Sequence, residues 1–456
     1  MKMKPLSLET IARVTDGVYV GAEKDRSRQI SSVEHDSRKV APGALFLCIK
    51  GERSDGHDYA NRAFESGAVC CLCEEDIRDA AGPYIKVAST LVALKALGAY
   101  YRSLFTIPVI GITGSVGKTS AKEMIAAALS AKFKVCKTEA NLNNEIGVPL
   151  TLLSMREEHE AAVIEMGISD FGEMTRLGQM VRPDICVMTN IGYCHLECLG
   201  DLNGVLKAKS EVFAQMKETG IAVVNGDDAL LSAFDPGLKK ITYGTSAAHN
   251  FSAKNIRDSG TDGIDCDIAH GAGCFPVHIP AFGSHLVLAA LAAASVAELL
   301  GLGEAEIARG LLSYRAVGGR ANVVDHGEYT VINDCYNANP NSVRAALLSL
   351  AGLEGRRVAI LGDMFELGRD SDSLHEEIGA FAAEKDIELL ICCGENAVHI
   401  YRGFIENSER EAYHFTNRDT LITMLPTLLS KGDRILVKAS HGMHFEHIVD
   451  ALLKNE

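Results

Sequence analysis

Apolar residues in the middle of the chain occur in short runs that alternate with helix-forming stretches. Between residues 107 and 225 the runs are PVIGI, KVCKT, AAVIEMG, ICVMTNI and GIAVVN, and the segments between them include AKEMIAAALSA and AKSEVFAQM. An Ala-rich stretch at 286–300 ends the series. Strand-length apolar runs separated by helical segments indicate βαβ units. The pattern therefore predicts a largely parallel sheet with helices on both faces.

Similar patterns occur on both sides of this segment. Before the turn Ala81-Gly82-Pro83, the strand-like runs ALFLCI and AVCCLC are mixed with two helical segments and the polar stretch GERSDGHDY. After residues 316–319, the runs YTVIND, RRVAILGD, IELLICCG and DRILVKAS again alternate with helices. A chain of 456 residues is too long for one core. We expect three α/β domains, at 1–85, 86–316 and 317–456, the last of Rossmann-like character.

The amino-acid composition limits the kinds of molecule that this protein is expected to bind. Hydrophobic residues make up 47% of the chain, charged residues 23%, and the formal net charge is −15. This acidic balance opposes binding to nucleic acid, and no basic stretch with interleaved aromatic residues is present. The first residues lack an apolar signal core, and the longest apolar run, Leu286 to Leu302, is interrupted by Ser295 and Glu298. We expect a soluble cytoplasmic protein with no nucleic-acid partner and no membrane insertion.

The thirteen cysteines are scattered along the chain. Three of them lie in the strand-like run AVCCLC, where cysteine behaves as a small apolar residue. Cys194 and Cys198 flank a histidine in CHLEC, which superficially resembles a metal site, but no second pair with zinc-finger spacing accompanies it. We therefore expect reduced thiols.

A glycine-rich loop follows the run PVIGI. Residues 111–120 read GITGSVGKTS. In such a loop the backbone N–H groups face a phosphate, the lysine reaches the β- and γ-phosphates, and the hydroxyl holds Mg²⁺. The spacing differs from the strict P-loop because Ile112 stands where the first glycine is expected, and a turn whose glycines serve geometry alone is the alternative. The predicted ATP-binding residues are Gly114, Ser115, Val116, Gly117, Lys118, Thr119 and Ser120.

Three further side chains occur where an open α/β sheet presents its ligand-binding groups. Glu165 comes at the end of an apolar strand, where a carboxylate suits Mg²⁺; an ordinary surface glutamate is the alternative. His195 follows the next strand and should reach the same sheet edge, although a lone histidine is more often structural. Lys209 lies in a helical segment, where a single lysine is usually a solvated surface charge.

The order of these motifs resembles the Mur ligases of peptidoglycan synthesis. The resemblance rests on GITGSVGKTS, the strand with Glu165, TNIGYCHLECLG and AKSEVF, and it covers nearly the whole chain. The segments TEANLNNEIGVPLT (138–151), DCYNANPNS (334–342) and HDSRKVAPGALFLCIKGERSDGHDY are similar to the MurF type of this family. This implies an ATP-dependent ligase that adds D-alanyl-D-alanine to UDP-N-acetylmuramoyl-tripeptide through an acyl phosphate. A Mur-type ligase that adds one amino acid, or an ATP-dependent switch that forms no bond, is the alternative.

The resemblance also assigns catalytic and metal-binding residues. It implies two Mg²⁺ ions, because the two anions that react must be screened before phosphoryl transfer. Thr119 and Glu165 would hold the first ion, and His195 would help to hold the second. Lys209 matches a family lysine that CO₂ converts to a carbamate, which turns a cation into an anionic metal ligand. Lys118, Glu165, His195 and Lys209 are thus the expected catalytic residues.

Substrate contacts follow from the same resemblance. Asn141, Asn143 and Asn144 offer amides suited to a peptide and a sugar, with turn and cap formation as the alternative. The residues expected at the UDP end are Ser37, Arg38, Asp55, Gly56 and His57, and the planar fork of arginine fits a diphosphate. The residues expected at the nucleotide are His285, Arg320 and Asp334, with Asn337 and Asn339 at nucleotide or substrate.

Two segments depart from the family pattern. In GSHLVLA (283–289), Leu286 and Ala289 replace the two asparagines of the usual G-x-H-N-x-x-N segment beside adenine. In VKASHGMHFE, His441 stands where the family has arginine.

The expected fold is α/β with three domains. A central P-loop ATPase domain with a parallel sheet is flanked by an α/β N-terminal substrate domain and a Rossmann-like C-terminal domain. We expect a monomer whose outer domains close over the substrates.

Overall fold

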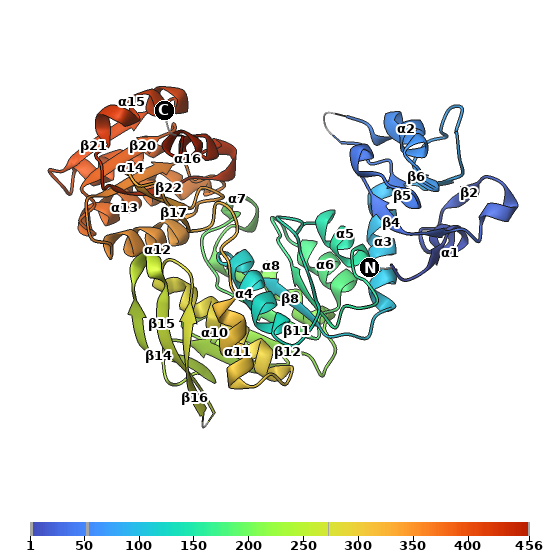
Figure 1. Cartoon of the computed structure of the whole chain (residues 1–456), viewed down its shortest axis with the longest axis horizontal. Helices are drawn as coiled ribbons and strands as arrows, with labels where there is room; N and C mark the ends of the chain where they lie inside the picture. The colour runs from blue at the N-terminus through green and yellow to red at the C-terminus, as the bar shows by residue number, and fades with distance from the viewer. Residues whose placement is uncertain (1–2, 52–53, 272, 455–456) are drawn as a thin grey trace.

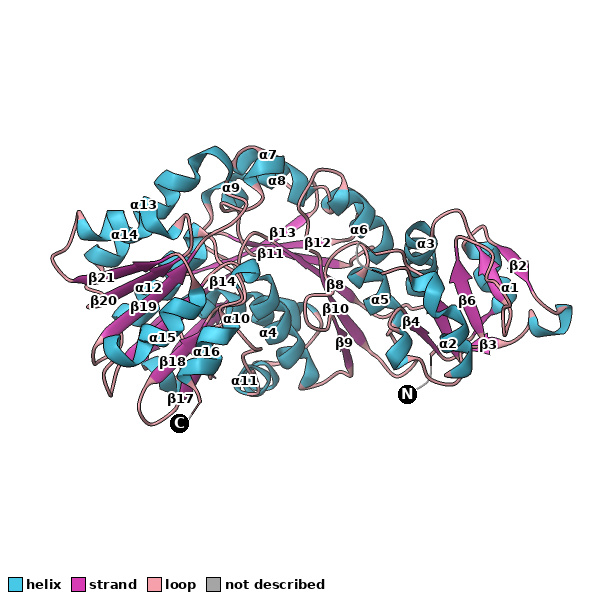
Figure 2. Cartoon of the chain, turned by 90° about the horizontal axis from the view of Figure 1, so that it is seen from above, coloured by secondary structure: helices cyan, strands magenta, loops and turns pink. Residues whose placement is uncertain are grey.

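The computed structural model of the chain describes residues 3–51, 54–271 and 273–454. Three α/β bodies follow one another along the chain, and Figure 2 shows them in a row with the central sheet between the two outer ones. Within the described residues, none of the helices is both long enough and apolar enough to cross a membrane.

The N-terminal body is built on a five-stranded sheet with the strand order β2-β7-β6-β5-β4. Its elements are β1 (Leu6–Ser7), α1 (Leu8–Val14), β2 (Val18–Val20), β3 (Gln29–Ile30), β4 (Ser32–Glu34), β5 (Ala44–Leu47), α2 (Ala60–Glu65), β6 (Cys70–Cys73) and β7 (Tyr84–Lys86). The expected boundary at residue 85 falls inside β7, which pairs with β6 and β2 and so belongs to this sheet.

The central body contains a nine-stranded sheet with the order β16-β15-β14-β13-β12-β11-β8-β10-β9. Its strands are β8 (Val109–Thr113), β9 (Val135–Lys137), β10 (Ala161–Glu165), β11 (Ile185–Met188), β12 (Ile221–Asn225), β13 (Lys239–Gly244), β14 (Phe251–Asp258), β15 (Ile264–His270) and β16 (Gly273–Ile279). Its helices are α3 (Thr90–Ser103), α4 (Lys118–Ser130), α5 (Gly147–Leu153), α6 (Glu173–Val181), α7 (Leu196–Leu199), α8 (Leu202–Ser210), α9 (Ala229–Ala233), α10 (Val287–Leu299) and α11 (Glu304–Leu312).

Both faces of the central sheet are covered, as the sequence pattern predicts. Successive residues of β10 alternate between two hydrophobic cores, with Ala162 and Ile164 in one and Ala161 and Val163 in the other. Strands β9 to β14 run parallel, whereas β15 and β16 form an antiparallel extension that the sequence reasoning did not predict. The first of the two cores continues through α3 into the N-terminal sheet.

The C-terminal body has a six-stranded sheet with the order β17-β18-β22-β19-β20-β21. Its elements are β17 (Asn322–Asp325), β18 (Thr330–Asn333), α12 (Pro340–Ala351), β19 (Arg357–Gly362), α13 (Ser371–Glu384), β20 (Leu389–Cys393), α14 (Ala397–Ile405), β21 (Glu411–Phe415), α15 (Arg418–Leu428), β22 (Arg434–Lys438) and α16 (Glu446–Leu452). The four apolar runs named above became β18, β19, β20 and β22. The two edge strands, β17 and β21, were missed because they are only partly buried and carry a mixed pattern.

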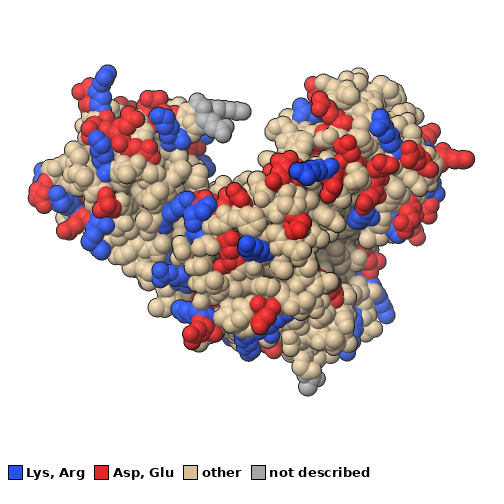
Figure 3. Space-filling view, turned by 180° about the vertical axis from the view of Figure 1, so that it is seen from behind, with Lys and Arg blue, Asp and Glu red and all other residues tan. Residues whose placement is uncertain are grey.

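The outer bodies stand on the same side of the central body and leave an open gap between them. Figure 1 shows this gap between the C-terminal body, in orange and red, and the N-terminal body, in blue. The space-filling view from behind shows the same hollow (Figure 3). The C-terminal body contacts the central body near α7 and α12, whereas the N-terminal body reaches it through α3 (Figure 1).

Candidate active site

The glycine-rich loop joins the end of β8 to the start of α4 at the centre of the parallel sheet. Gly114 has φ +141° and lies so close to β11 that a Cβ there would be 2.0 Å from Thr189 Oγ1. Thr189 Oγ1 donates to the Val116 carbonyl at 2.6 Å, and the Val116 N–H donates to Asn190 Oδ1 at 2.8 Å. The segment after β11 therefore fixes the loop, and only glycine fits the closest approach.

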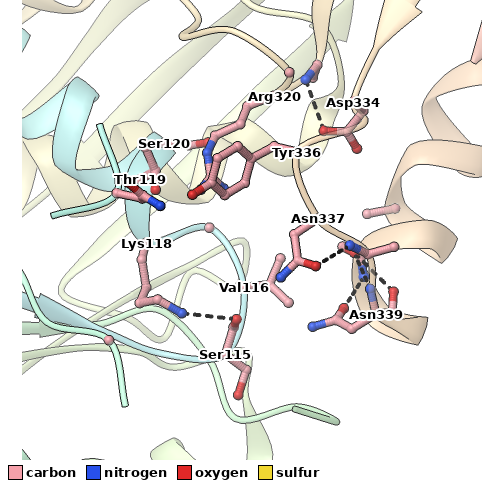
Figure 4. Close-up of a pocket in the computed structure, with 18 of the residues that line it drawn as sticks. Ser115, Val116, Lys118, Thr119, Ser120, Arg320, Asp334, Tyr336, Asn337 and Asn339 are labelled. Carbon is pink, nitrogen blue, oxygen red and sulfur yellow. Dashed lines mark hydrogen bonds between the residues drawn. The ribbon is translucent and has the colours of Figure 1, made fainter. Parts of the chain in front are cut away.

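Lys118 begins α4 and folds its side chain back over the loop. Its Nζ donates to the carbonyls of Gly114 at 2.7 Å and Ser115 at 3.3 Å, and Figure 4 shows the bond to Ser115. Burial lowers the pKa of Lys118 from its ordinary value. The ammonium group has carbonyl partners rather than a carboxylate, so an incoming phosphate is not in competition with a fixed anion.

Thr119 and Glu165 meet at the start of α4. Thr119 Oγ1 lies 3.1 and 2.9 Å from the two carboxylate oxygens of Glu165, and Asn143 Nδ2 donates to Oε1 at 2.8 Å. The Glu165 N–H donates to Thr138 Oγ1. Glu165 is only 1% exposed. Hydroxyl, carboxylate and amide oxygens are the ligands that a hard divalent cation prefers, so this set fits Mg²⁺.

A buried lysine that the sequence reasoning missed stands beside this carboxylate. Lys122, one turn after Thr119, is 1% exposed, and its Nζ lies 3.9 Å from Glu165 Oε2 and 3.0 Å from Glu123 Oε1. It also donates to the Thr138 carbonyl at 2.7 Å. The helical spacing of three residues from Thr119 was a signal that could have placed it on the same face.

His195 lies in the loop after β11 and faces the C-terminal body. Its backbone has a left-handed conformation, with φ +52°. Nδ1 lies 2.5 Å from Oε2 of Glu366, and this contact holds the pKa of the Glu366 carboxyl below its ordinary value. Glu366 belongs to the loop after β19, far away in sequence, which is why no local pattern pointed to it.

Lys209 is fully buried near the end of α8. Its Nζ has no hydrogen-bond partner in the part of the chain that the structure describes. Loss of water, and then the nearby positive charge of Lys118, lower the pKa of Lys209 to about 8. A buried amine without a partner is unfavourable, so this position differs from the solvated surface charge that a lone lysine usually is.

The C-terminal body closes one side of the cleft. The Arg320 guanidinium lies over the ring of Tyr336, 4.0 Å from its centroid. Asp334 accepts from the Ala321 N–H at 3.0 Å, and its other oxygen pairs with Lys438 Nζ at 2.6 Å. Figure 4 shows Arg320, Tyr336 and Asp334 across the cleft from Lys118 and Thr119. Tyr336 and Lys438 were not predicted.

The asparagines have separate environments. Asn339 caps α12 by accepting from the Ser342 N–H at 2.9 Å, and Asn337 Oδ1 accepts from the Ala338 N–H. Asn144 Oδ1 accepts from the N–H groups of residues 146 and 147 at the start of α5 and does not line the cleft. Asn141 lines the cleft beside Asn143. These bonds are those of a cap, which was the alternative to substrate contact; the substrate contact of Asn144 stays a prediction.

The residues expected at the UDP end lie in the N-terminal body and are not brought to this cleft. Ser37 and Arg38 begin a short turn, and the Arg38 guanidinium, whose side chain is 80% exposed, donates to both carboxylate oxygens of Asp36 at 2.9 and 2.8 Å. These bonds hold the pKa of Asp36 well below its ordinary value.

Asp55, Gly56 and His57 form a second short turn of the same body. Asp55 Oδ1 accepts from the His57 N–H at 3.0 Å and lies 2.5 Å from His57 Nδ1. His57 Nε2 accepts from the Glu74 N–H at 2.8 Å. Both nitrogens of the ring are therefore engaged within the domain.

The cleft between the central and C-terminal bodies has a volume of about 330 Å³. Of the predicted residues, those that line it are Ser115, Val116, Gly117, Lys118, Thr119, Ser120, Asn141, Asn143, Glu165, His195, His285, Arg320, Asp334, Asn337 and Asn339. Leu286, where the family usually has an asparagine, also lines it beside His285. His441 stacks on Tyr336 with ring centroids 5.2 Å apart.

The fold and this cleft define a class: a three-domain α/β nucleotide-binding protein, with a phosphate loop at the carboxyl edge of a parallel sheet and a second α/β domain across from it. Family models match three segments: the Mur ligase family catalytic domain at residues 29–102, the Mur ligase middle domain at 112–297, and the Mur ligase glutamate ligase domain at 319–441. The chain belongs to the Mur ligase family.

Individual relatives align with this chain over nearly its full length. The UDP-N-acetylmuramoyl-tripeptide--D-alanyl-D-alanine ligase of Bacillus subtilis is 35% identical over 457 residues, which cover 98% of each chain. A crystal structure of MurF from Acinetobacter baumannii has a TM-score of 0.89 and 30% identity, with 100% of both chains covered. MurF ligase from Thermotoga maritima in complex with ADP has a TM-score of 0.82 and 27% identity, covering 92% of this chain and 97% of that one.

Proposed function

We propose that this chain is an ATP-dependent, ADP-forming ligase that joins D-alanyl-D-alanine to UDP-N-acetylmuramoyl-tripeptide, the last cytoplasmic step of peptidoglycan precursor synthesis. The observation that carries the proposal is the convergence of the phosphate loop, the Thr119–Glu165 pair and the C-terminal residues Arg320 and Asp334 on one cleft. The names of the full-length relatives support the same reaction.

The reaction needs an activated carboxyl group, because a carboxylate is a poor electrophile. An oxygen of the tripeptide's terminal carboxylate attacks the γ-phosphorus of ATP, and the bond to the β,γ-bridging oxygen breaks to release ADP. The amine of D-alanyl-D-alanine then attacks the acyl carbon, phosphate leaves with the bonding electrons, and the amine loses a proton. Lys118 at the loop offsets the phosphate charge, and residues from two domains hold the reacting anions in line.

Two Mg²⁺ ions would supply charge neutralisation between the carboxylate and the γ-phosphate. Thr119 and Glu165 would hold one of them, and His195 the other. Among the described residues, no group of three or more His, Cys, Asp or Glu side chains is placed to hold a metal ion. The protein donors alone are therefore few, as is usual for Mg²⁺ sites that the phosphates of the nucleotide complete.

Lys209 fits the role of a carbamate-bearing residue. Its buried amine has no partner in the described part of the structure, and its pKa of about 8 leaves more of the nucleophilic neutral form than an ordinary lysine has. CO₂ would add to the neutral Nζ with loss of a proton, and the resulting carbamate would carry two oxygens and a negative charge. Its neighbour Lys118 would then face a counter-charge.

The remaining predicted contacts complete the proposal. Asn141 and Asn143 would contact the peptide substrate near the loop, while Arg320, Asp334 and His285 would contact the nucleotide. Ser37, Arg38 and the turn 55–57 would hold the UDP end on the N-terminal domain, across the open gap of Figure 1. Closure of the outer domains would bring the two ends of the substrate together.

A reducing compartment suits this chain, since its thirteen cysteines are free thiols and eleven of them are not exposed. We propose that the enzyme acts in the cytoplasm as a monomer. Analytical ultracentrifugation of the purified protein tests the oligomeric state.

The test is reconstitution with ATP, Mg²⁺, UDP-N-acetylmuramoyl-tripeptide and D-alanyl-D-alanine, omitting each component in turn while product mass and phosphate are followed. Pentapeptide formed only with all components supports the proposal. Single amino acids offered in place of the dipeptide test the rival in which one residue is added. Phosphate release that needs neither peptide substrate would favour an ATP-dependent switch instead.

A further inference from the structure

One contact between the central and C-terminal domains reaches directly into the cleft. His195 lines the cleft, and its buried Nδ1 lies 2.5 Å from Oε2 of Glu366, a close contact that does not meet hydrogen-bond geometry in the part of the chain that the structure describes. The Leu196 N–H donates to the Glu366 carbonyl at 3.2 Å. Side chain and backbone of one C-terminal residue thus engage two successive residues of the loop after β11. The loop is fixed from the opposite domain at this point.

Both partners of the contact have an unusual backbone. His195 has φ +52° and Glu366 has φ +63°, in the left-handed region that residues other than glycine adopt uncommonly; His, like Asn and Asp, is enriched there, whereas Glu is not. Such conformations persist only where the surrounding structure enforces them, and they occur preferentially at functional sites. Gly368, two residues after Glu366, lies beside Leu196 and Glu197, because a Cβ added at Gly368 would be 3.7 Å from the Glu197 nitrogen. Two strained loops, one from each domain, therefore hold this pair of side chains together.

We propose that Glu366 is a positioning residue for the ligase reaction: its carboxylate accepts the Nδ1 proton of His195, fixes the ring, and leaves the Nε2 lone pair directed to the cleft. A histidine that acts as a ligand commonly donates its other ring nitrogen to a carboxylate, which sets both tautomer and orientation. The inference rests on the proposed function insofar as His195 serves the Mg²⁺ site of that reaction.

Glu366 also couples the orientation of His195 to the docking of the C-terminal domain. Because the carboxylate and the imidazole belong to different domains, His195 is oriented only while the C-terminal domain is docked on α7. Docking also brings Arg320 and Asp334 to the nucleotide side of the cleft. Assembly of the His195 ligand and closure of the nucleotide site are thus one event, so binding of a divalent cation and docking of the domain favour each other.

The tautomer of the His195 ring can be measured directly by NMR. In protein without nucleotide or metal, labelled with ¹⁵N-histidine and held at mildly alkaline pH, long-range ¹H–¹⁵N spectra report the tautomer of each ring, and His195→Gln identifies the signal. We expect a single Nδ1–H tautomer in the wild type and a mixture in Glu366→Ala. Glu366→Gln, whose carbonyl oxygen can still accept the proton, should retain the single tautomer. Mn²⁺ binding in the presence of ADP should weaken about 10-fold or more in Glu366→Ala.

Glu409→Ala removes an exposed carboxylate of the same domain and is the matched control, with unchanged spectrum and Mn²⁺ affinity. An Nε2–H tautomer in the wild type, a single Nδ1–H tautomer in Glu366→Ala, or a mixture in Glu366→Gln would overturn the proposal. Because the spectra need no turnover, a protein that fails to make pentapeptide but shows the fixed tautomer refutes the proposed function and leaves the positioning role standing.

Discussion

Replacing Lys209 by methionine should make the protein more stable. The Lys209 Nζ is fully buried and has no hydrogen-bond partner within the described residues. Burial lowers its pKa from 10.5 to about 8. At about 1.4 kcal/mol per pKa unit, this corresponds to about 3 kcal/mol of stability that the unmodified chain loses at neutral pH. Methionine has a similar length and no charge, so it fills the same space without this loss.

The stability difference has a defined dependence on pH. Below about pH 8, the folded chain must hold a buried charge that the unfolded chain carries in water, so the loss is complete. Between about pH 8 and pH 10.5, the unfolded chain binds more protons at this residue than the folded chain, and the stability of the wild type therefore rises with pH relative to the variant. Above that window the difference disappears.

The assay is thermal unfolding in CO₂-free buffers across this pH range. We expect Lys209→Met to melt several degrees above the wild type at pH 7, with the gap closing as the pH approaches 10.5. Lys207→Met removes an exposed lysine from the same helix and should change the melting temperature little. A Lys209→Met variant that melts below the wild type, or a gap that is constant with pH, would refute the reasoning.

Four further outcomes are expected. Lys209→Ala should abolish pentapeptide synthesis, and added acetate should partly restore it, because a small carboxylate can take the place of the carbamate oxygens. Thr119→Val should lower the ligation rate about 10-fold or more, while Thr119→Ser keeps the hydroxyl and most of the rate. Gly114→Ala would place a methyl group 2.0 Å from Thr189 Oγ1 at a positive φ; we expect a destabilisation of about 1–3 kcal/mol and weaker ADP binding in calorimetry. Solution scattering should show a more compact particle when an ATP analogue and both substrates are bound.

Each of these expectations has a contrary result. Full activity of Lys209→Ala would remove the carbamate assignment, and failure of acetate to restore any synthesis would weaken it. Equal rates for Thr119→Val and the wild type would show that the hydroxyl holds no metal. Unchanged ADP affinity in Gly114→Ala would mean that the loop shifts freely. The same scattering curve with and without ligands would argue against domain closure.

Local features of the chain predicted the central part of the site. Strand-length apolar runs between helical segments define βαβ units, and in such units a phosphate loop and a strand-end carboxylate come to the same sheet edge. Thr119 and Glu165 are 2.9 Å apart at that edge, as this rule implies. Backbone geometry sets the spacing of residues along a strand or helix. A short-range sequence pattern is therefore sufficient to place residues at the end of a strand or the start of a helix, as for Thr119 and Glu165.

Other features of the structure were not predicted. The antiparallel extension of β15 and β16 and the edge strands β17 and β21 have mixed patterns, because partly exposed strands bury less apolar surface. Lys122 reads as an ordinary helical lysine, although it is buried beside Glu165. Asn144 was predicted as a substrate contact, with cap formation as the alternative, and the structure shows its Oδ1 accepting from the N–H groups at the start of α5.

By itself, the sequence determined the three α/β units, the phosphate loop and the carboxylate of Glu165 at the strand end, because backbone periodicity and loop chemistry act over a few residues. Only the tertiary structure decided that Arg320, Asp334 and Lys438 lie opposite Lys118, that Glu366 contacts His195, and that Lys209 is buried with no hydrogen-bond partner among the described residues. These relations depend on how whole sheets and domains pack, and packing joins residues more than a hundred positions apart that no local pattern connects.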